Sequence, residues 1–240
     1  GRIQGAEALI RWPQADGSLV SPGQFIPVAE NLGLIKPIGQ WVLDTACDHL
    51  DRWLGIRPDL RLCINLSPVQ VGDGTATRAL LERIDTSGLP GQSLEFEITE
   101  GMLIHNLADL GPLIHELQQR GIGLSLDDFG TGYSSMTRLK ELPLNTLKID
   151  KSLIGGIPDD SGEMAIVRAV IEMTRGLQMR SLAEGVETAG QWRFLQESGC
   201  ELGQGFFFSY PIPAEQFEAL IREDRRWSTN DEAERAVSPR

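Results

Sequence analysis

The segment that decides the fold is SLEFEIT, residues 93–99, in which apolar and polar side chains alternate. Because successive side chains of a strand point to opposite faces, Leu94 and Phe96 would share one face while Glu95 and Glu97 share the other. In a closed barrel of parallel strands, the apolar face would pack outward on helices and the polar face would point inward. Barrel interiors are usually filled by branched apolar side chains, so inward acidic residues near a strand end indicate a site.

Six further segments have strand-like patterns, and helical patterns separate them. The strand candidates are GAEALIR (5–11), LRLCINL (60–66), IGLSLDD (122–128), NTLKID (145–150), MRSLAEG (179–185) and GQGFFF (203–208). The helical patterns cover residues 38–53, 107–117, 166–174 and 213–221, together with a helix that starts at Ser21 as N-cap, Pro22 and Gln24. Such alternation predicts an α/β fold whose parallel strands are joined by crossover helices.

The predicted architecture is a TIM-like (β/α)8 barrel that lacks one strand. We count seven strands where a barrel needs eight. The chain begins at Gly1 directly before a strand, so we expect the missing strand and a longer protein upstream. A doubly wound open sheet is the alternative, and it would concentrate its site on one or two loops. Polar residues stand near the end of nearly every predicted strand, which favours the barrel.

The composition argues against several classes of protein. The chain has 22 Lys and Arg residues against 34 Asp and Glu residues, a formal charge of −12, so a groove for duplex nucleic acid is not expected. Cys47, Cys63 and Cys200 form no CxxC pair, which argues against a disulfide framework and a thiolate zinc site. No apolar run is long enough to span a membrane, and no secretion signal opens the chain. We therefore expect a domain over residues 1–226 that faces the cytoplasm, even in a membrane-anchored protein, and a disordered polar tail over 227–240.

Seven polar residues near the ends of the predicted strands would converge at one mouth of the barrel. They are Glu7, Asn65, Glu97, Asp127, Asp128, Lys148 and Glu184. Repulsion among five carboxylates, offset by a single ammonium, would favour protonation of some of the acids unless cations were bound among them. Two divalent cations balance the charge, and an all-oxygen ligand set suits Mg²⁺ or Mn²⁺ rather than zinc. Two such ions could clamp the attacking and leaving oxygens of a phosphoryl transfer.

Other catalytic chemistries find little support in the sequence. His49, His105 and His115 lie in helical patterns, and no nucleophile motif accompanies them. The triplet DFG at 128–130 matches a kinase motif by its letters alone, without a glycine-rich phosphate loop. The three consecutive phenylalanines at 206–208 are interpreted as strand packing in preference to a base-stacking platform.

Seven ordered motifs resemble those of the EAL-domain phosphodiesterases, and they extend over almost the whole chain. The motifs are GAEALIRW (5–12), SPGQFIPVAENLGLI (21–35), INLSPVQ (64–70), EFEITEGML (95–103), LDDFGTGYSSMTRLKELPLNTLKIDKSLI (126–154), LAEGVET (182–188) and GQGFFFSYPIP (203–213). The resemblance implies a TIM-like barrel whose first strand runs antiparallel to the others. That strand is absent here, in agreement with the count of seven, and its absence would leave barrel edges open.

The resemblance also implies a role for each matching residue. The metal ligands would be Glu7, Asn65, Glu97 and Asp127 for the first ion, with Asp127 bridging to a second ion that Asp128 helps to hold. Lys148 would position or deprotonate the attacking water, and Glu184 would hold metal-bound water. The substrate and the water network of the metal site would be contacted by Arg11, Leu9 and Gln204. Glu100 would anchor the loop 128–135, which would also touch a dimer partner.

The implied reaction is metal-dependent hydrolysis of one phosphodiester bond of cyclic di-GMP, which gives linear pGpG. The implied partners are a second copy of the chain in a homodimer and an upstream domain of the GGDEF, PAS or receiver type. Two alternatives stay open, a cyclic di-GMP receptor without turnover and a protein-interaction module. Every metal and base position matches the family, which favours the enzyme. Tyr210 departs from it, since many members carry a basic residue before Pro211, so a guanine or phosphate contact would differ here.

Overall fold

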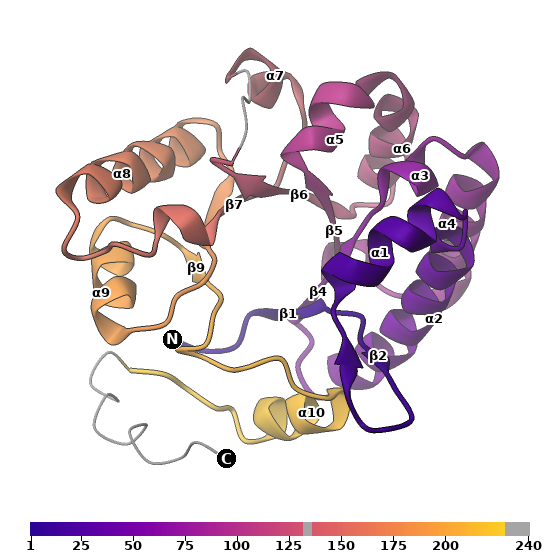
Figure 1. Cartoon of the computed structure of the whole chain (residues 1–240), viewed down its shortest axis with the longest axis horizontal. Helices are drawn as coiled ribbons and strands as arrows, with labels where there is room; N and C mark the ends of the chain where they lie inside the picture. The colour runs from indigo at the N-terminus through magenta and orange to yellow at the C-terminus, as the bar shows by residue number, and fades with distance from the viewer. Residues whose placement is uncertain (132–135, 229–240) are drawn as a thin grey trace. The chain divides into compact units, whose positions relative to one another are not determined.

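The computed structural model describes residues 1–131 and 136–228 (Figure 1). The chain divides into two compact units. The N-terminal unit comprises Gln4–Ile98 and Met102–Leu124, and the C-terminal unit comprises Gly1–Ile3, Thr99–Gly101 and Ser125–Arg240. Each unit is built from parallel strands with helices packed beside them.

The N-terminal unit contains three parallel strands in the order β1 (Gly5–Ala8), β4 (Arg61–Asn65) and β5 (Leu94–Thr99). The helices α2 (Ile35–Leu54), α4 (Gly74–Ser87) and α6 (Leu107–Gln119) lie on one side of these strands (Figure 1). The shorter elements of the unit are α1 (Pro22–Asn31), α3 (Pro68–Val71), η1 (Gly91–Ser93) and α5 (Glu100–His105), the last of which begins in the C-terminal unit. An antiparallel hairpin of β2 (Trp12–Pro13) and β3 (Leu19–Val20) follows β1.

The C-terminal unit contains four parallel strands in the order β6 (Gly123–Phe129, from Ser125 onward), β7 (Thr146–Ile149), β8 (Arg180–Ala183) and β9 (Leu202–Gly203). The helices α8 (Ser161–Gly176) and α9 (Ala189–Glu197) lie outside these strands (Figure 1). The remaining elements are α7 (Met136–Glu141), η2 (Lys151–Leu153) and α10 (Ala214–Arg222). The described residues therefore hold seven parallel strands, in agreement with the count made from the sequence.

Strand β5 carries the alternation that the sequence predicts, but both of its faces are buried. Phe96 and Ile98 are 0% exposed, while Glu95 and Glu97 on the opposite face are only 3% and 2% exposed. Buried carboxylates are costly unless other groups compensate their charge. The polar face of β5 is therefore an interior feature of the fold and not a solvated surface.

One local prediction was wrong and another is confirmed. The expected strand over 203–208 is much shorter, because β9 ends at Gly203 and residues 206–208 form a turn. The predicted helix start is confirmed, since Ser21 is the N-cap of α1 and Pro22 is its first residue, although the Ser21 side chain accepts no capping hydrogen bond.

The C-terminal end of the described chain packs on the fold. Trp227 is 8% exposed, and its indole Nε1 donates to the carbonyl oxygen of Phe208 at 2.8 Å. Of the tail expected over 227–240, residues 229–240 lie outside the described part. In the residues described, no helix combines the length and the apolar character needed to cross a membrane.

Asp73 shows how a single carboxylate stabilises the N-terminal unit. It is the N-cap of α4, where its carboxylate accepts hydrogen bonds from the N–H groups of Thr75 and Ala76 at 2.8 and 3.2 Å, and it pairs with Lys36 of α2. The hydrogen bond from Lys36, together with those backbone donors, lowers the pKa of Asp73 to about 2. A carboxyl group with a depressed pKa stabilises the fold above its unfolded-state pKa, and this contribution is lost as the pH falls toward the folded-state pKa.

We therefore expect Asp73→Asn to lower Tm at pH 7 by about 2 °C. The difference from the wild type should shrink as the pH falls from about 4 toward about 2, because the unfolded chain then binds a proton while the folded carboxylate, with its pKa of about 2, is still ionised. Calorimetry between pH 7 and about pH 3 tests this, with Asp51→Asn on the exposed face of α2 as the matched control. A difference in Tm that did not change with pH would contradict the role given to the Asp73 charge.

Candidate functional site

A bulge in β6 brings two consecutive aspartates to the same side of the strand. In a regular strand Asp127 and Asp128 would point to opposite faces. Here the register with β7 shifts between Leu126 and Phe129, and Asp128 has a positive φ of 57°. An extra residue in one strand re-aims side chains in this way, and aspartate tolerates the left-handed region better than most residues. The oxygens of both aspartates come within 4.8 Å of each other as a result.

The centre of this group is the ammonium of Lys148 on β7. Its side chain is 1% exposed, and Nζ lies 3.1 Å from Oδ1 of Asp127 and 2.8 Å from Oε1 of Glu184. Burial of an ammonium group costs free energy unless a carboxylate pairs with it. Asp127 and Glu184 therefore stabilise the buried Lys148, and Lys148 in turn offsets part of their negative charge. Asp127 and Glu184 are themselves mostly buried, at 14% and 18% exposure.

Backbone hydrogen bonds hold Glu184 and Gln204 beside this lysine. Glu184 follows β8, and its N–H donates to the carbonyl oxygen of Ile149 at 3.0 Å. The N–H of Gln204 donates to Ala183 at 2.8 Å, so Gln204 lies at the end of the neighbouring strand β9. Gly185 has a φ of 65°, and a Cβ there would meet Cβ of Lys151 at 2.5 Å, which only glycine avoids.

The acidic group fits a divalent cation. Asp127, Asp128 and Glu184 each offer an oxygen, and these oxygens all lie within 4.8 Å of one another. This group combines three carboxylates with the buried ammonium of Lys148. In addition, Oδ1 of Asp127 is buried and accepts no hydrogen bond from the described residues, although the Lys148 ammonium lies 3.1 Å away. Carboxylate oxygens of this kind are the ligands that Mg²⁺ and Mn²⁺ prefer.

Asp150 shares the polar face of β7 with Lys148 but has a structural role. Its carboxylate caps η2 by accepting a hydrogen bond from the N–H of Ser152 at 2.9 Å. Burial alone would raise the pKa of Asp150, but the hydrogen bonds from Ser152 and the nearby Lys151 hold it below the ordinary value. This carboxylate is therefore ionised and engaged in the local turn.

The N-terminal unit holds a second group of the predicted residues. Asn65 at the end of β4 donates from Nδ2 to Oε1 of Glu7 at 2.7 Å. In the strand register Glu7 is opposite Cys63 and Asn65 is opposite Glu97, so all three site residues lie near the carboxyl ends of neighbouring strands. Glu97 is 2% exposed. This group again offers only carboxylate and amide oxygens.

The residues expected to contact substrate follow the strands. Leu9 is 42% exposed, and Arg11 is exposed with Nη1 donating to the neighbouring carbonyl oxygen of Ile10 at 2.8 Å. Glu100 is 3% exposed, and neither of its carboxylate oxygens has a hydrogen-bond partner among the described residues. The loop that Glu100 is expected to anchor includes residues 132–135, which lie outside the described part of the chain.

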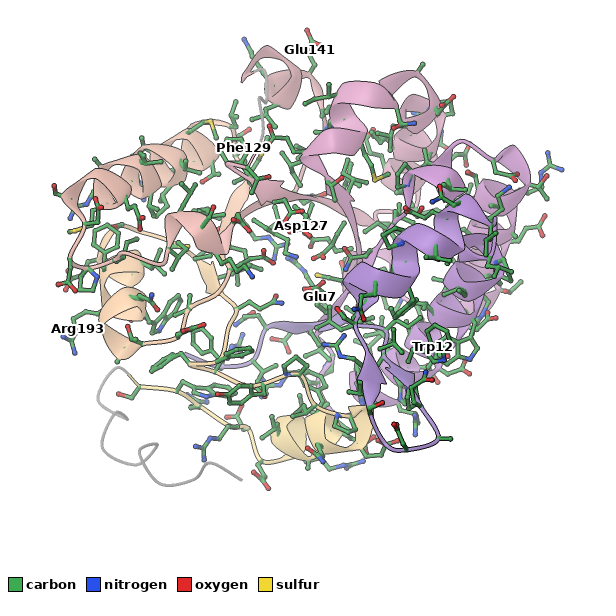
Figure 2. All side chains as sticks on the ribbon, in the orientation of Figure 1. Glu7, Trp12, Asp127, Phe129, Glu141 and Arg193 are labelled. Carbon is green, nitrogen blue, oxygen red and sulfur yellow. The ribbon has the colours of Figure 1, made fainter. Side chains whose placement is uncertain are left out.

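The seven predicted site residues thus form two groups, one in each unit. The C-terminal group is Asp127, Asp128, Lys148 and Glu184, and the N-terminal group is Glu7, Asn65 and Glu97. The bulge at Asp127 was not foreseen. The sequence indicates it only through the two adjacent aspartates at the end of a strand, because a regular strand would point their side chains to opposite faces. Figure 2 labels Glu7 and Asp127 on their strands.

Comparison with known proteins places this geometry in a family. The model of the EAL domain matches residues 1–211. The chain belongs to the EAL domain family.

The EAL domain has relatives in several bacteria. It is 40% identical over 222 residues to the bifunctional diguanylate cyclase/cyclic di-GMP phosphodiesterase MucR of Pseudomonas aeruginosa, covering 92% of this chain and 32% of the relative. It is 44% identical over 222 residues to the signaling protein YkoW of Bacillus subtilis, with 92% and 28% covered. The chain thus spans about a third of the length of these curated relatives.

A solved structure of the PaMucR phosphodiesterase in complex with c-di-GMP has the same fold as this EAL domain. The TM-score is 0.85 at 40% sequence identity, over 90% of this chain and 88% of the solved one. The TIM-like α/β fold expected from the sequence is therefore confirmed.

The EAL domain should lose affinity for divalent cations when the acidic group of its C-terminal unit is reduced. We expect Asp127→Asn to weaken Mn²⁺ binding by more than about tenfold, because even the loss of a residue behind a metal ligand costs about 10- to 100-fold. Calorimetric titration with MnCl₂ measures the affinity. Asp159→Asn, an exposed residue of the same unit, is the matched control. Equal affinities for the two variants would show that Asp127 holds no cation.

Proposed function

We propose that this EAL domain hydrolyses one phosphodiester bond of cyclic di-GMP to linear pGpG, with two divalent cations of the Mg²⁺ or Mn²⁺ class. The observation that carries the proposal is the carboxylate group Asp127, Asp128 and Glu184 around the buried ammonium of Lys148. A phosphodiester is itself an anion, and it can approach such a group only when cations accompany it. The arrangement therefore suits metal-assisted phosphoryl transfer better than a nucleophile mechanism.

The relatives support the choice of substrate. MucR is named as a bifunctional diguanylate cyclase/cyclic di-GMP phosphodiesterase, and NbdA of Pseudomonas aeruginosa, 39% identical over 223 residues, is named as a cyclic di-GMP phosphodiesterase. The PaMucR structure contains c-di-GMP. Every metal and base position of the family is matched in this chain, which favours turnover over a receptor that only binds.

The ligands of the cations are assigned from the family resemblance. We assign Glu7, Asn65, Glu97 and Asp127 to the first ion, and Asp127 with Asp128 to the second. When bound, such ions supply the Lewis acidity that makes water nucleophilic near neutral pH and that offsets negative charge on the phosphoryl group. Oδ1 of Asp127 is buried and accepts no hydrogen bond from the part of the chain that the structure describes, so it would be available to a cation.

The attacking water would be oriented by Lys148 and Glu184. The Lys148 ammonium is fixed by its contacts at 2.8 and 3.1 Å, so it can direct a donor hydrogen toward one position. The Glu184 carboxylate is an acceptor at the same place and can hold the water by one of its protons. A water held from both sides loses little further entropy when it attacks phosphorus and displaces the 3′ oxygen.

The other residues named from the family would bind substrate or shape the site. Arg11 supplies a guanidinium suited to a phosphate oxygen, Leu9 offers an exposed apolar contact, and Gln204 lies beside Glu184. Glu100 would anchor the loop 128–135. A homodimer, a fused upstream domain of the GGDEF, PAS or receiver type, and one continuous domain over 1–226 stay predictions from the family resemblance.

The proposal is tested by incubating the chain with cyclic di-GMP and Mg²⁺ or Mn²⁺ and separating the products by chromatography. We expect pGpG to accumulate with either metal and to disappear with EDTA. Glu7→Ala should remove hydrolysis while circular dichroism remains that of the wild type. Binding of cyclic di-GMP without product, under every metal condition, would instead indicate a receptor.

The role of Lys148 gives a separate prediction. Lys148→Ala should lower kcat by about 100-fold or more, since a group that positions or accepts a proton contributes about 10²- to 10⁴-fold. Mn²⁺ should still bind, because the carboxylate ligands remain. The control is Arg193→Ala, which removes an exposed positive charge from α9 (Figure 2). Wild-type turnover in the Lys148 variant would refute the assigned role.

A further inference from the structure

The side-chain amide of Gln191 connects two segments of the C-terminal unit. Gln191 lies in the first turn of α9 and is only 6% exposed. Its Oε1 accepts hydrogen bonds from the N–H groups of Glu187 and Thr188 at 2.7 and 3.0 Å. Its Nε2 donates to the carbonyl oxygen of Ile154 at 3.2 Å. The amide therefore joins the segment after β8 to the segment after β7.

Capping of α9 accounts for only part of these contacts. Thr188 is the N-cap of the helix, and its side chain accepts a hydrogen bond from the N–H of Gln191 at 3.1 Å. The bond from the Thr188 N–H to the Gln191 side chain completes a capping box. A glutamate serves this purpose as well as a glutamine does. The contact with Ile154 is different, because it needs the donor N–H of an amide, which a carboxylate lacks.

The two joined segments follow the residues that form the buried ion pair of the candidate site. Glu184 stands three residues before Glu187, and Lys148 stands six residues before Ile154. Nζ of Lys148 lies 2.8 Å from Oε1 of Glu184. This distance depends on how the segment after β8 is held against the segment after β7, because Glu184 belongs to the first and Lys148 leads into the second.

The Gln191 amide adds a contact beyond those that lie close to the strands. At the end of β8, the N–H of Glu184 donates to the carbonyl oxygen of Ile149 at 3.0 Å. The next residue, Gly185, packs closely on η2, since a Cβ there would meet Cβ of Lys151 at 2.5 Å. Gln191 then fastens the same segment again further along the chain. A segment that is held on both sides of Gly185 has fewer conformations, which keeps the neighbouring carboxylate in place.

We propose that Gln191 is a positioning residue, whose bridge between the two segments keeps the Glu184 carboxylate beside Lys148. This inference rests on the function proposed above, in which Glu184 and Lys148 orient the attacking water. Gln191 acts through the backbone of residues 154, 187 and 188. A misplacement of about 1 Å can lower a rate by about 100-fold, so loss of the bridge should affect kcat. It should affect KM little, because the groups assigned to bind the phosphates remain.

A kinetic test separates the bridge from the helix cap. Gln191→Glu keeps an oxygen for the N–H groups of Glu187 and Thr188 but removes the donor to Ile154. We expect its kcat for cyclic di-GMP to fall about 10- to 100-fold, with KM within about twofold of the wild type. The matched control is Thr188→Ala, which removes the other half of the capping box, leaves the bridge and should keep the wild-type kcat. Gln191→Met, which is neutral and of similar length, should reproduce the fall if the glutamate variant does not fold.

Amide hydrogen exchange gives a second readout that does not depend on turnover. The N–H of Glu184 donates to Ile149, so its exchange rate reports how firmly the segment after β8 is held. We expect this exchange to be about fivefold faster in Gln191→Glu than in the wild type, the change that corresponds to one lost hydrogen bond. Thr188→Ala should speed exchange only in the first turn of α9.

The outcomes keep this inference distinct from the proposed function. A wild-type chain that makes no pGpG would overturn the function, and faster exchange at Glu184 in Gln191→Glu would still support the bridge. Unchanged exchange at Glu184 in that variant, or a wild-type kcat, would overturn the positioning role and leave the hydrolase standing. An equal fall of kcat in Thr188→Ala would also overturn it, because the helix cap alone would then explain the effect.

Discussion

The buried ammonium of Lys148 is the constraint around which the candidate site is organised. At 1% exposure it cannot rely on water, so its charge must be met by Asp127 and Glu184. Asp127 lies on β6, Lys148 on β7 and Glu184 directly after β8, so these two ion pairs connect three neighbouring strands. Removal of either carboxylate would leave the buried ammonium with one ion-pair partner in place of two, and removal of the lysine would leave acids that repel one another unless a cation were bound.

That requirement explains the irregular backbone of β6. A regular strand would send Asp128 away from Lys148 and Asp127, and the group would then have one carboxylate fewer. The positive φ of Asp128 and the register shift against β7 place a conformational cost at this point. The neighbouring parallel ladders are regular and well buried, so they can hold such a local distortion. The strained backbone is found where the two aspartates are brought to the same side of the strand.

The turn after β9 contributes some side chains to the core and others to the surface. Gly205 allows close backbone contact with Val186, and this contact positions Gln204 next to the loop of Glu184. One side of the turn buries Phe207 and packs Phe208, while the other side presents Phe206 to Tyr210. A short segment thereby serves the core, the acidic group and a neutral aromatic surface.

The sequence by itself determined the α/β class, the seven strands, most helices and the identity of the acidic residues, because alternation of side chains and the spacing of strand ends are local properties. It also determined the family, through motifs that extend along most of the chain. Only the tertiary structure decided that Asp127 and Asp128 point to the same side of β6 and that β9 ends at Gly203. It also decided that Phe206 is exposed and stacks on Tyr210. These outcomes depend on a bulge, a close backbone contact and a turn. Their energies come from residues distant in the chain, which a local pattern cannot register.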